Sequence, residues 1–101
     1  MSIHTLSKTQ VERLIRSMAA NRSRVFITTH AAVRMRQRHV TREIVHEVLE
    51  KGRLVRIPEL NLGRGSLECR MERYCSGRQL GVVVAISDDE PDLLIITVIE
   101  T

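Results

Sequence analysis

The sequence predicts a small α+β domain in which N-terminal helices pack on a mainly antiparallel sheet of about four strands. Three observations lead to this fold class. Helical periodicity dominates the first half of the chain, strand-like alternation dominates the second half, and the connections between the segments are short. The length of 101 residues fits one domain, so we expect residues 1–101 to form a single unit.

The first half of the chain begins with a capped amphipathic helix. Ser7 is placed as its N-cap, and Gln10 three residues later completes a capping box. Apolar residues then recur at helical spacing until the polar residues 21–23 end the helix. Residues 25–29 are rich in β-branched side chains and predict a short strand, and residues 30–38 favour a second helix.

A third helix is expected between Thr41 as N-cap and Gly52 as a C′ glycine. The remainder of the chain is strand-like, because short apolar or alternating runs are separated by turn residues. The expected strands are residues 53–57, 67–74, 80–86 and 93–99, separated by a loop over 59–65, a turn over 75–78 and an acidic turn over 87–92.

Positive charge is concentrated in the helical half. Residues 1–57 hold twelve Lys and Arg against four acidic residues, a balance of +8, whereas residues 58–101 hold four Arg against eight acidic residues, a balance of −4. Such asymmetry suggests a side that faces a polyanion, although solvated helix surfaces also carry many basic residues. One Phe, one Tyr and no Trp leave little scope for stacking several bases on aromatic rings.

Composition also bears on the cellular compartment. Two cysteines are too few for a disulfide scaffold, no apolar run reaches the about 18 residues of a membrane span, and residues 1–7 lack a hydrophobic signal region. We therefore expect a cytoplasmic protein with free thiols and no membrane association.

Residues 29–42 contain basic side chains and no acidic one. Guanidinium groups match phosphate oxygens in two-point contacts, which makes these residues candidates for nucleic-acid binding. The candidates for nucleic-acid binding are Arg34, Arg36, Arg38 and Arg42. The alternative is that Glu43, Glu47 or acidic residues of the sheet neutralise these arginines.

One face of the second helix combines an imidazole with guanidinium groups. At about 100° per residue, His30, Arg34 and Arg38 fall within roughly 80° of one another. A histidine titrates near neutral pH and can transfer protons, but a lone histidine is more often a structural hydrogen-bonding group. Arg70 and Tyr74 share one face of the predicted strand 67–74, and Tyr74 could donate or accept a proton or stack on one base.

No metal or cofactor is expected from these patterns. Cys69 and Cys75 are six positions apart, whereas zinc knuckles space their cysteines more closely. Cys69 alternates with Leu67 and Met71, which indicates a core position. The sequence contains no phosphate-cradling glycine loop and no nucleophile elbow.

Residues 28–38 read T-x-H-A-x-x-R-M-x-x-R, and apolar positions follow at Val40, Ile44, Val48 and Leu49 before Gly52. This pattern resembles a bacterial family of domains of unknown function, which is similar in architecture to the RelE-like and MqsR-like mRNA interferase toxins of toxin–antitoxin pairs. The resemblance implies a single toxin-like domain that cleaves mRNA, either free or on the ribosome, and a cognate antitoxin protein that neutralises it.

The resemblance also assigns roles to residues in a metal-free cleavage. It implies His30 as base or acid and Tyr74 as the other proton carrier. It implies that Arg34, Arg38 and Arg70 stabilise the charge that develops on the phosphate. Two other functions fit the basic helical face: a non-catalytic module that binds RNA or the ribosome, and an interaction module that accepts an acidic protein segment.

Overall fold

The computed structural model describes residues 2–89 and 92–100, and in this part of the chain three helices and a mixed open sheet of six strands confirm the α+β class. The helices are α1 (Lys8–Ala20), α2 (Thr29–Gln37) and α3 (Arg42–Lys51), with short 3-10 turns over Ile3–Thr5 and Arg22–Arg24. The strands are β1 (Val25–Ile27), β2 (Arg53–Leu54), β3 (Glu59–Asn61), β4 (Ser66–Cys75), β5 (Arg78–Ile86) and β6 (Leu93–Glu100).

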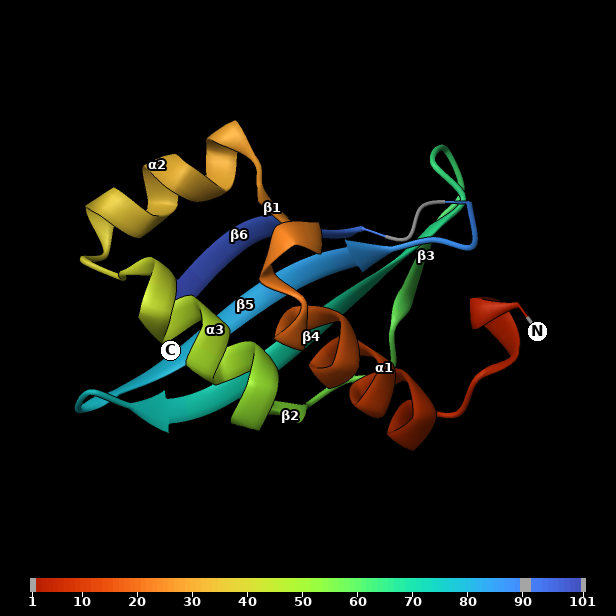
Figure 1. Ribbon diagram of the computed structural model, residues 1–101, viewed down its shortest axis with the longest axis horizontal. Helices are drawn as coiled ribbons and strands as arrows, with labels where there is room; N and C mark the ends of the chain where they lie inside the picture. Colours follow the sequence, from red (N-terminus) through yellow and green to blue (C-terminus); the bar gives the residue numbers. More distant parts are fainter. Residues whose placement is uncertain (1, 90–91, 101) are drawn as a thin grey trace.

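The sheet has the strand order β1-β6-β5-β4-β2, and β3 pairs with β4 beside β2 (Figure 1). All pairs are antiparallel except that of β1 with β6. The three long strands β4, β5 and β6 form its centre, as expected from their apolar alternation. The short strands β1, β2 and β3, each two or three residues long, extend its edges, and β3 is the strand that the sequence did not predict.

The core lies between the sheet and the helices α1 and α3, which lie in front of the sheet in Figure 1. Alternate residues of a strand point to opposite faces, so Cys69 and Met71 of β4 enter the core while Arg70 and Glu72 lie on the face that α1 and α3 leave uncovered. Both cysteines are buried free thiols. The largest fully buried apolar side chains are Ile15 of α1, Leu49 of α3, Met71 of β4, Leu80 and Ile86 of β5, and Leu93 and Ile95 of β6.

Helix α2 lies along the outer edge of β6, beyond the short strand β1 (Figure 1). The hydroxyl of Thr28 donates to the carbonyl oxygen of Ile95 over 2.8 Å, and Nε of Arg38 donates to that of Val98 over 3.2 Å. The carbonyl oxygen of Ile95 also accepts the backbone N–H of Thr28 over 3.1 Å. The carbonyl of Val98 lies beyond the end of β1, so the bond from Arg38 satisfies a group that the edge of β6 would otherwise leave unpaired. Both ends of α2 are therefore attached to the same strand.

Helix starts follow the predicted caps. Ser7 and Gln10 form the complete capping box of α1, and the side chain of Thr41 accepts from the backbone N–H of Ile44 at the start of α3. Thr28 takes the same role for α2, which differs from the expected strand over residues 25–29. Strand β1 ends at Ile27 because the Thr28 hydroxyl is used as a helix cap.

Two further expectations need correction. The expected strand over 53–57 is shortened to Arg53–Leu54, and one further backbone bond of 3.3 Å joins the N–H of Val55 to the carbonyl oxygen of Arg70. The expected loop over 59–65 contains β3, because residues 59–61 find partners along the exposed edge of β4. Sequence periodicity cannot show such pairing, since it depends on where β4 lies.

Gly52 ends α3, but it is not the expected C′ glycine. Its φ of −77° and ψ of −175° are extended backbone, which any residue adopts. A Cβ atom there would lie 2.3 Å from the carbonyl oxygen of Val48 and 2.7 Å from that of Glu72. Glycine is needed because β4 approaches the end of α3 so closely.

The longest helix, α1, has 13 residues, whereas a membrane-spanning helix needs about 20. Across residues 2–89 and 92–100, no helix is long and apolar enough to cross a membrane.

Candidate functional site

Within residues 2–89 and 92–100, the arginines of α2 and the start of α3 have no carboxylate partner. Glu43 accepts two hydrogen bonds from Arg22, at 2.8 and 3.3 Å, and Glu47 accepts one from Arg73 at 3.0 Å. The hydrogen bonds from Arg22 lower the pKa of the Glu43 carboxyl below its usual value. The acids that could have neutralised the α2 arginines are thus engaged elsewhere. Within the described residues, no carboxylate forms an ion pair with Arg34, Arg36, Arg38 or Arg42.

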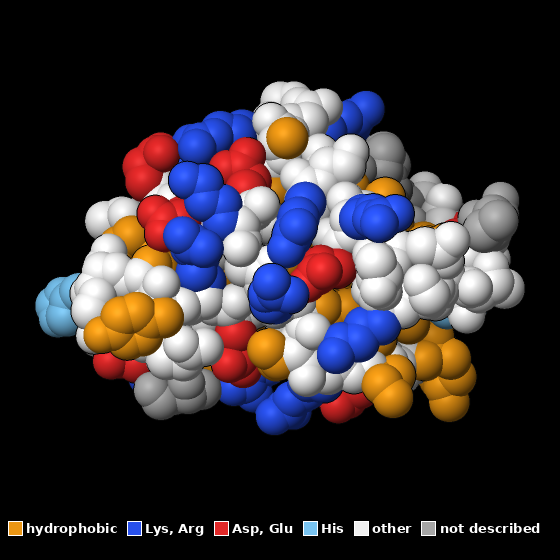
Figure 2. Space-filling view, turned by 90° about the horizontal axis from the view of Figure 1, so that it is seen from below, with side chains coloured by type: hydrophobic (Ala, Val, Ile, Leu, Met, Phe, Trp, Pro, Cys, Tyr) orange, Lys and Arg blue, Asp and Glu red, His pale blue; other side chains and the backbone are white. Residues whose placement is uncertain are grey.

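Six other basic side chains differ from this group because they form ion pairs; they are Arg16, Arg22, Arg24, Arg70, Arg73 and Arg78. Within the described residues, Lys8, Arg13, Lys51, Arg53, Arg56 and Arg64 form none. On the face seen in Figure 2, some basic side chains lie directly beside acidic ones and others do not. Arg24 pairs with Asp92, Arg70 with Glu72 and Arg78 with Glu100. The absence of such pairing around α2 leaves a local excess of positive charge.

His30, Arg34 and Arg38 lie along one side of α2, as predicted from their spacing. His30 is exposed in the first turn, and the two arginines are half-buried. Arg34 donates to the side-chain oxygen of Gln37 over 3.1 Å, and Nε of Arg38 bonds to the edge of β6. With a rise of about 1.5 Å per residue, the three positions span roughly 12 Å along the helix. We call His30, Arg34 and Arg38 the α2 stripe.

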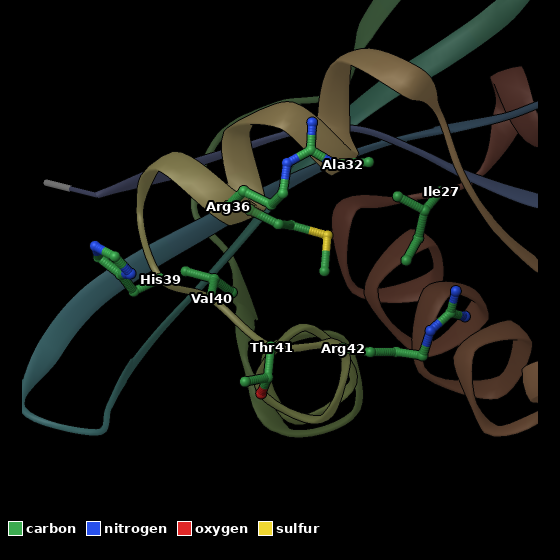
Figure 3. A pocket seen from close by; sticks show the side chains of 8 residues that line it. Ile27, Ala32, Arg36, His39, Val40, Thr41 and Arg42 are labelled. Carbon is green, nitrogen blue, oxygen red and sulfur yellow. The ribbon is translucent and has the colours of Figure 1, made fainter.

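A hollow of about 740 Å³ lies on another side of α2, where the chain turns into α3. In Figure 3, Arg36 projects from α2 and Arg42 from the start of α3, with Ile27 between them. We call this the α2–α3 hollow. Its lining residues are Ile27, Ala32, Met35, Arg36, His39, Val40, Thr41 and Arg42.

The four predicted nucleic-acid-binding arginines therefore occupy two surfaces. At about 100° per residue, Arg36 lies roughly 160° around α2 from Arg34 and Arg38. The buried residue Ala31 fills the side of α2 between them that faces the core. Arg34 and Arg38 belong to the α2 stripe, whereas Arg36 and Arg42 line the α2–α3 hollow.

Arg70 and Tyr74 lie on the uncovered face of β4, as their spacing predicts. Nε of Arg70 is 2.7 Å from a carboxylate oxygen of Glu72, and both side chains are less than one-fifth exposed. The Arg70 side chain passes over Gly81, where a Cβ atom would lie 3.4 Å from its Nε. Tyr74 is 67% exposed.

The predicted catalytic residues do not all converge. Thr28 bonds to β6 at Ile95, which places His30 near that level of the sheet. Tyr74 of β4 instead pairs with Gln79 of β5. Gln79 lies one residue past Leu80, which pairs with Glu100 at the C-terminal end of β6. Neighbouring strands are about 4.8 Å apart and residues about 3.3 Å apart along a strand, so the backbones of Tyr74 and His30 lie more than about 15 Å apart. His30, Arg34 and Arg38 share one side of α2, whereas Tyr74 lies at the end of the sheet away from His30, where Arg78 contacts the carbonyl oxygen of Arg38.

A family model described as a domain of unknown function, DUF4258, matches residues 27–100. The chain belongs to the DUF4258 family. No curated protein and no solved structure matches the chain. The DUF4258 match includes the α2 stripe, the α2–α3 hollow and both sheet residues, and it begins at Ile27, after α1. The relationship to RelE-like and MqsR-like toxins stays a prediction.

Sequence reasoning did not identify His39 and Thr41 of the DUF4258 domain as site residues. His39 has a φ of 54°, and the N–H of Val40 bonds back to the carbonyl oxygen of Met35 over 2.9 Å. This is a Schellman-type helix end with histidine in the left-handed position that glycine usually takes. The sequence did contain one signal for this turn. The connection between the two predicted helices is short, so its backbone had to bend sharply near His39.

Proposed function

We propose that this DUF4258 domain is a small RNA-binding ribonuclease that acts through the α2 stripe. The observation that carries the proposal is that Arg34 and Arg38, on one side of α2, have no carboxylate partner in the described chain, while Glu43 and Glu47 are engaged by Arg22 and Arg73. Like charges along one helix repel each other, and a bound polyanion relieves that repulsion.

The geometry of the α2 stripe suits a phosphodiester backbone. Arg34 and Arg38 present guanidinium groups on one side of a helix that is attached to β6 through Thr28 and Arg38. A helix held at both ends keeps these groups in place before the ligand arrives, which reduces the ordering cost of binding. The exposed imidazole of His30 lies one helical turn from Arg34.

The proposed chemistry is an attack of the ribose 2′-OH on the adjacent phosphate. His30 accepts the 2′-OH proton, O2′ bonds to phosphorus and the P–O5′ bond breaks, so the products carry a 2′,3′-cyclic phosphate and a 5′-OH. Arg34 and Arg38 stabilise the negative charge on the phosphoryl oxygens. O5′ takes up a proton as it leaves, either from water or from the His30 imidazolium that formed when the 2′-OH lost its proton.

The biological setting we propose is that of a toxin whose substrate is mRNA and whose activity a cognate antitoxin restrains. The support is the resemblance of residues 28–52 to a bacterial family of unknown function that is similar in architecture to such toxins. Induced expression in a bacterium is then expected to arrest growth and shorten mRNA.

The test uses purified protein and a labelled single-stranded RNA in buffer with EDTA. We expect cleavage by the wild type, loss of cleavage in His30→Ala with binding retained, and weaker binding in Arg34→Ala/Arg38→Ala. The slope of log affinity against log salt should become shallower by about one to two in the double variant. Lys8→Ala/Arg13→Ala removes the same charge from α1 and serves as the control. Cleavage by His30→Ala at the wild-type rate would refute the catalytic assignment.

A non-catalytic RNA-binding module is the second candidate. The separation of Tyr74 from His30 favours it, because the second predicted proton carrier is not beside the first. RNA binding that depends on Arg34 and Arg38, without cleavage by the wild type in the presence or absence of ribosomes, would support this candidate over the nuclease.

A further inference from the structure

The α2–α3 hollow combines apolar and cationic side chains. Ile27 and Met35 pack against the hydrophobic core and present their remaining surface to the hollow, together with Ala32 and Val40. The hollow has a volume of about 740 Å³ and is shallow and widely open to solvent. The space therefore accommodates several side chains of a ligand rather than a single small ion.

The charged part of the hollow is positive. Arg36 and Arg42 are exposed and form no ion pair within the described chain, and no acidic side chain is among the lining residues. Glu43 follows Arg42 directly but bonds to Arg22. Carboxylates of a ligand could therefore pair with both guanidinium groups, because no carboxylate of the described chain is paired with them.

We propose that the α2–α3 hollow is a docking site for an acidic amphipathic segment of a partner protein. A large apolar side chain of that segment would lie against Ile27 and Met35, and flanking Asp or Glu residues would pair with Arg36 and Arg42. The flexible side chain of Met35 can adapt its shape to the inserted group. Apolar anchors in a groove between helices are a common mode of peptide recognition.

The lining favours a peptide over RNA. Single-stranded RNA is usually held by bases stacked on aromatic rings, and no Phe, Tyr or Trp lines the hollow. Its aliphatic surface has no hydrogen-bonding groups for a phosphate or ribose, whereas burial of a leucine or isoleucine side chain against it is favourable.

The docking site is independent of the proposed ribonuclease activity. Arg36 and Arg34 lie on different sides of α2, so a peptide in the hollow would leave the α2 stripe exposed. The two surfaces can consequently be separated by mutation. Arg36→Glu/Arg42→Glu changes the hollow, and Arg13→Glu/Arg34→Glu changes the charge equally while leaving the hollow intact.

The experiment begins with random displayed peptides of about twelve residues selected on the intact protein. We expect enriched sequences in which Asp or Glu flank Leu, Ile, Met or Phe. The enriched peptide, as a synthetic fluorescent probe, should bind Arg36→Glu/Arg42→Glu at least about tenfold more weakly and the control variant within roughly twofold of the wild type. In NMR spectra of the complex, the methyl signal of Met35 should shift, while that of the buried Met71 should not.

Three results would overturn the proposal. One is the absence of peptides enriched on the wild type over Arg36→Glu/Arg42→Glu. Another is equal weakening by both variants, which would indicate diffuse charge attraction. The last concerns a labelled single-stranded RNA. If it binds Arg36→Glu/Arg42→Glu more weakly than the wild type but binds Arg13→Glu/Arg34→Glu with wild-type affinity, the hollow is an RNA subsite. Because RNA binding is measured on the same variants, failure of the docking proposal is distinguishable from failure of the ribonuclease proposal.

Discussion

Nη2 of Arg78 donates a hydrogen bond of 3.0 Å to the backbone carbonyl oxygen of His39. The first residue of β5 is thereby connected to the residue that follows the end of α2. Nη1 of the same side chain also donates to the carbonyl oxygen of Arg38 and pairs with Glu100 at 3.2 Å. A cation at the C-terminal end of a helix interacts favourably with the helix dipole. Arg78 therefore orients both the α2 stripe and the α2–α3 hollow.

Arg78→Gln is expected to lower the free energy of unfolding by about 1–2 kcal/mol, since it removes the charge from these bonds at the end of α2. Urea denaturation followed by circular dichroism measures the change. Arg34→Gln is the matched control, because within the part of the chain that the structure describes the Arg34 side chain bonds only to Gln37 on its own helix. An equal loss of stability in both variants would show that Arg78 does not hold α2.

His39→Gly is expected to stabilise the protein. The φ of 54° at His39 costs a non-glycine residue about 1 kcal/mol, which glycine does not incur. Gln37→Gly, two residues earlier and inside α2, should instead lower stability by about 1 kcal/mol. Thermal unfolding of the two variants checks the opposite signs. A lower melting temperature for His39→Gly would mean that the imidazole contributes more than its backbone strain costs.

Gly52→Ala is expected to destabilise the protein by roughly 2 kcal/mol or more, because its Cβ would overlap backbone oxygens of Val48 and Glu72 that cannot move independently. Gly63→Ala is the comparison, since a Cβ there meets only the Asn61 side chain at 3.5 Å. That variant should change the unfolding free energy by less than about 0.5 kcal/mol. Similar urea midpoints for both variants would contradict the close approach of β4 to α3.

The stability of the protein should fall as the pH drops below about 6.5, the ordinary pKa of histidine. His46 is only 1% exposed and its Nδ1 has no hydrogen-bond partner within the described chain. Burial, and then the positive charge of Arg22, lower its pKa, an effect that Glu50 and Glu43 partly oppose. The unfolded chain therefore binds a proton that the folded chain resists, so the stability contributed by neutral His46 is complete above pH 6.5 and decreases below it.

His46→Met should flatten this pH dependence. One proton of difference between the unfolded and folded states corresponds to a slope of at most about 1.4 kcal/mol per pH unit. Urea denaturation between pH 5 and pH 7.5 measures the slope for wild type and variant. Identical slopes in the two proteins would assign the pH dependence to other groups.

Local patterns in the sequence predicted most secondary structure, because the groups that decide it are close together along the chain. Ser7 and Gln10 cap α1 across three residues, and Thr41 caps α3 in the same way. The alternation of Leu67, Cys69 and Met71 was sufficient to predict β4 and its buried face. The stripe of His30, Arg34 and Arg38 followed from helical spacing alone.

Only the tertiary structure decided which charges remain available and which surfaces they form. Glu43 is 21 residues from its partner Arg22, and Asp92 is 68 residues from Arg24, so no local pattern could show that these acids are already engaged. The same holds for the separation of Tyr74 from His30, which depends on sheet register. The α2–α3 hollow also arises from packing, because it forms where Ile27 of β1 meets the turn between two helices. The sequence by itself determined the elements and their polar faces, whereas contacts between distant segments decided how those faces combine.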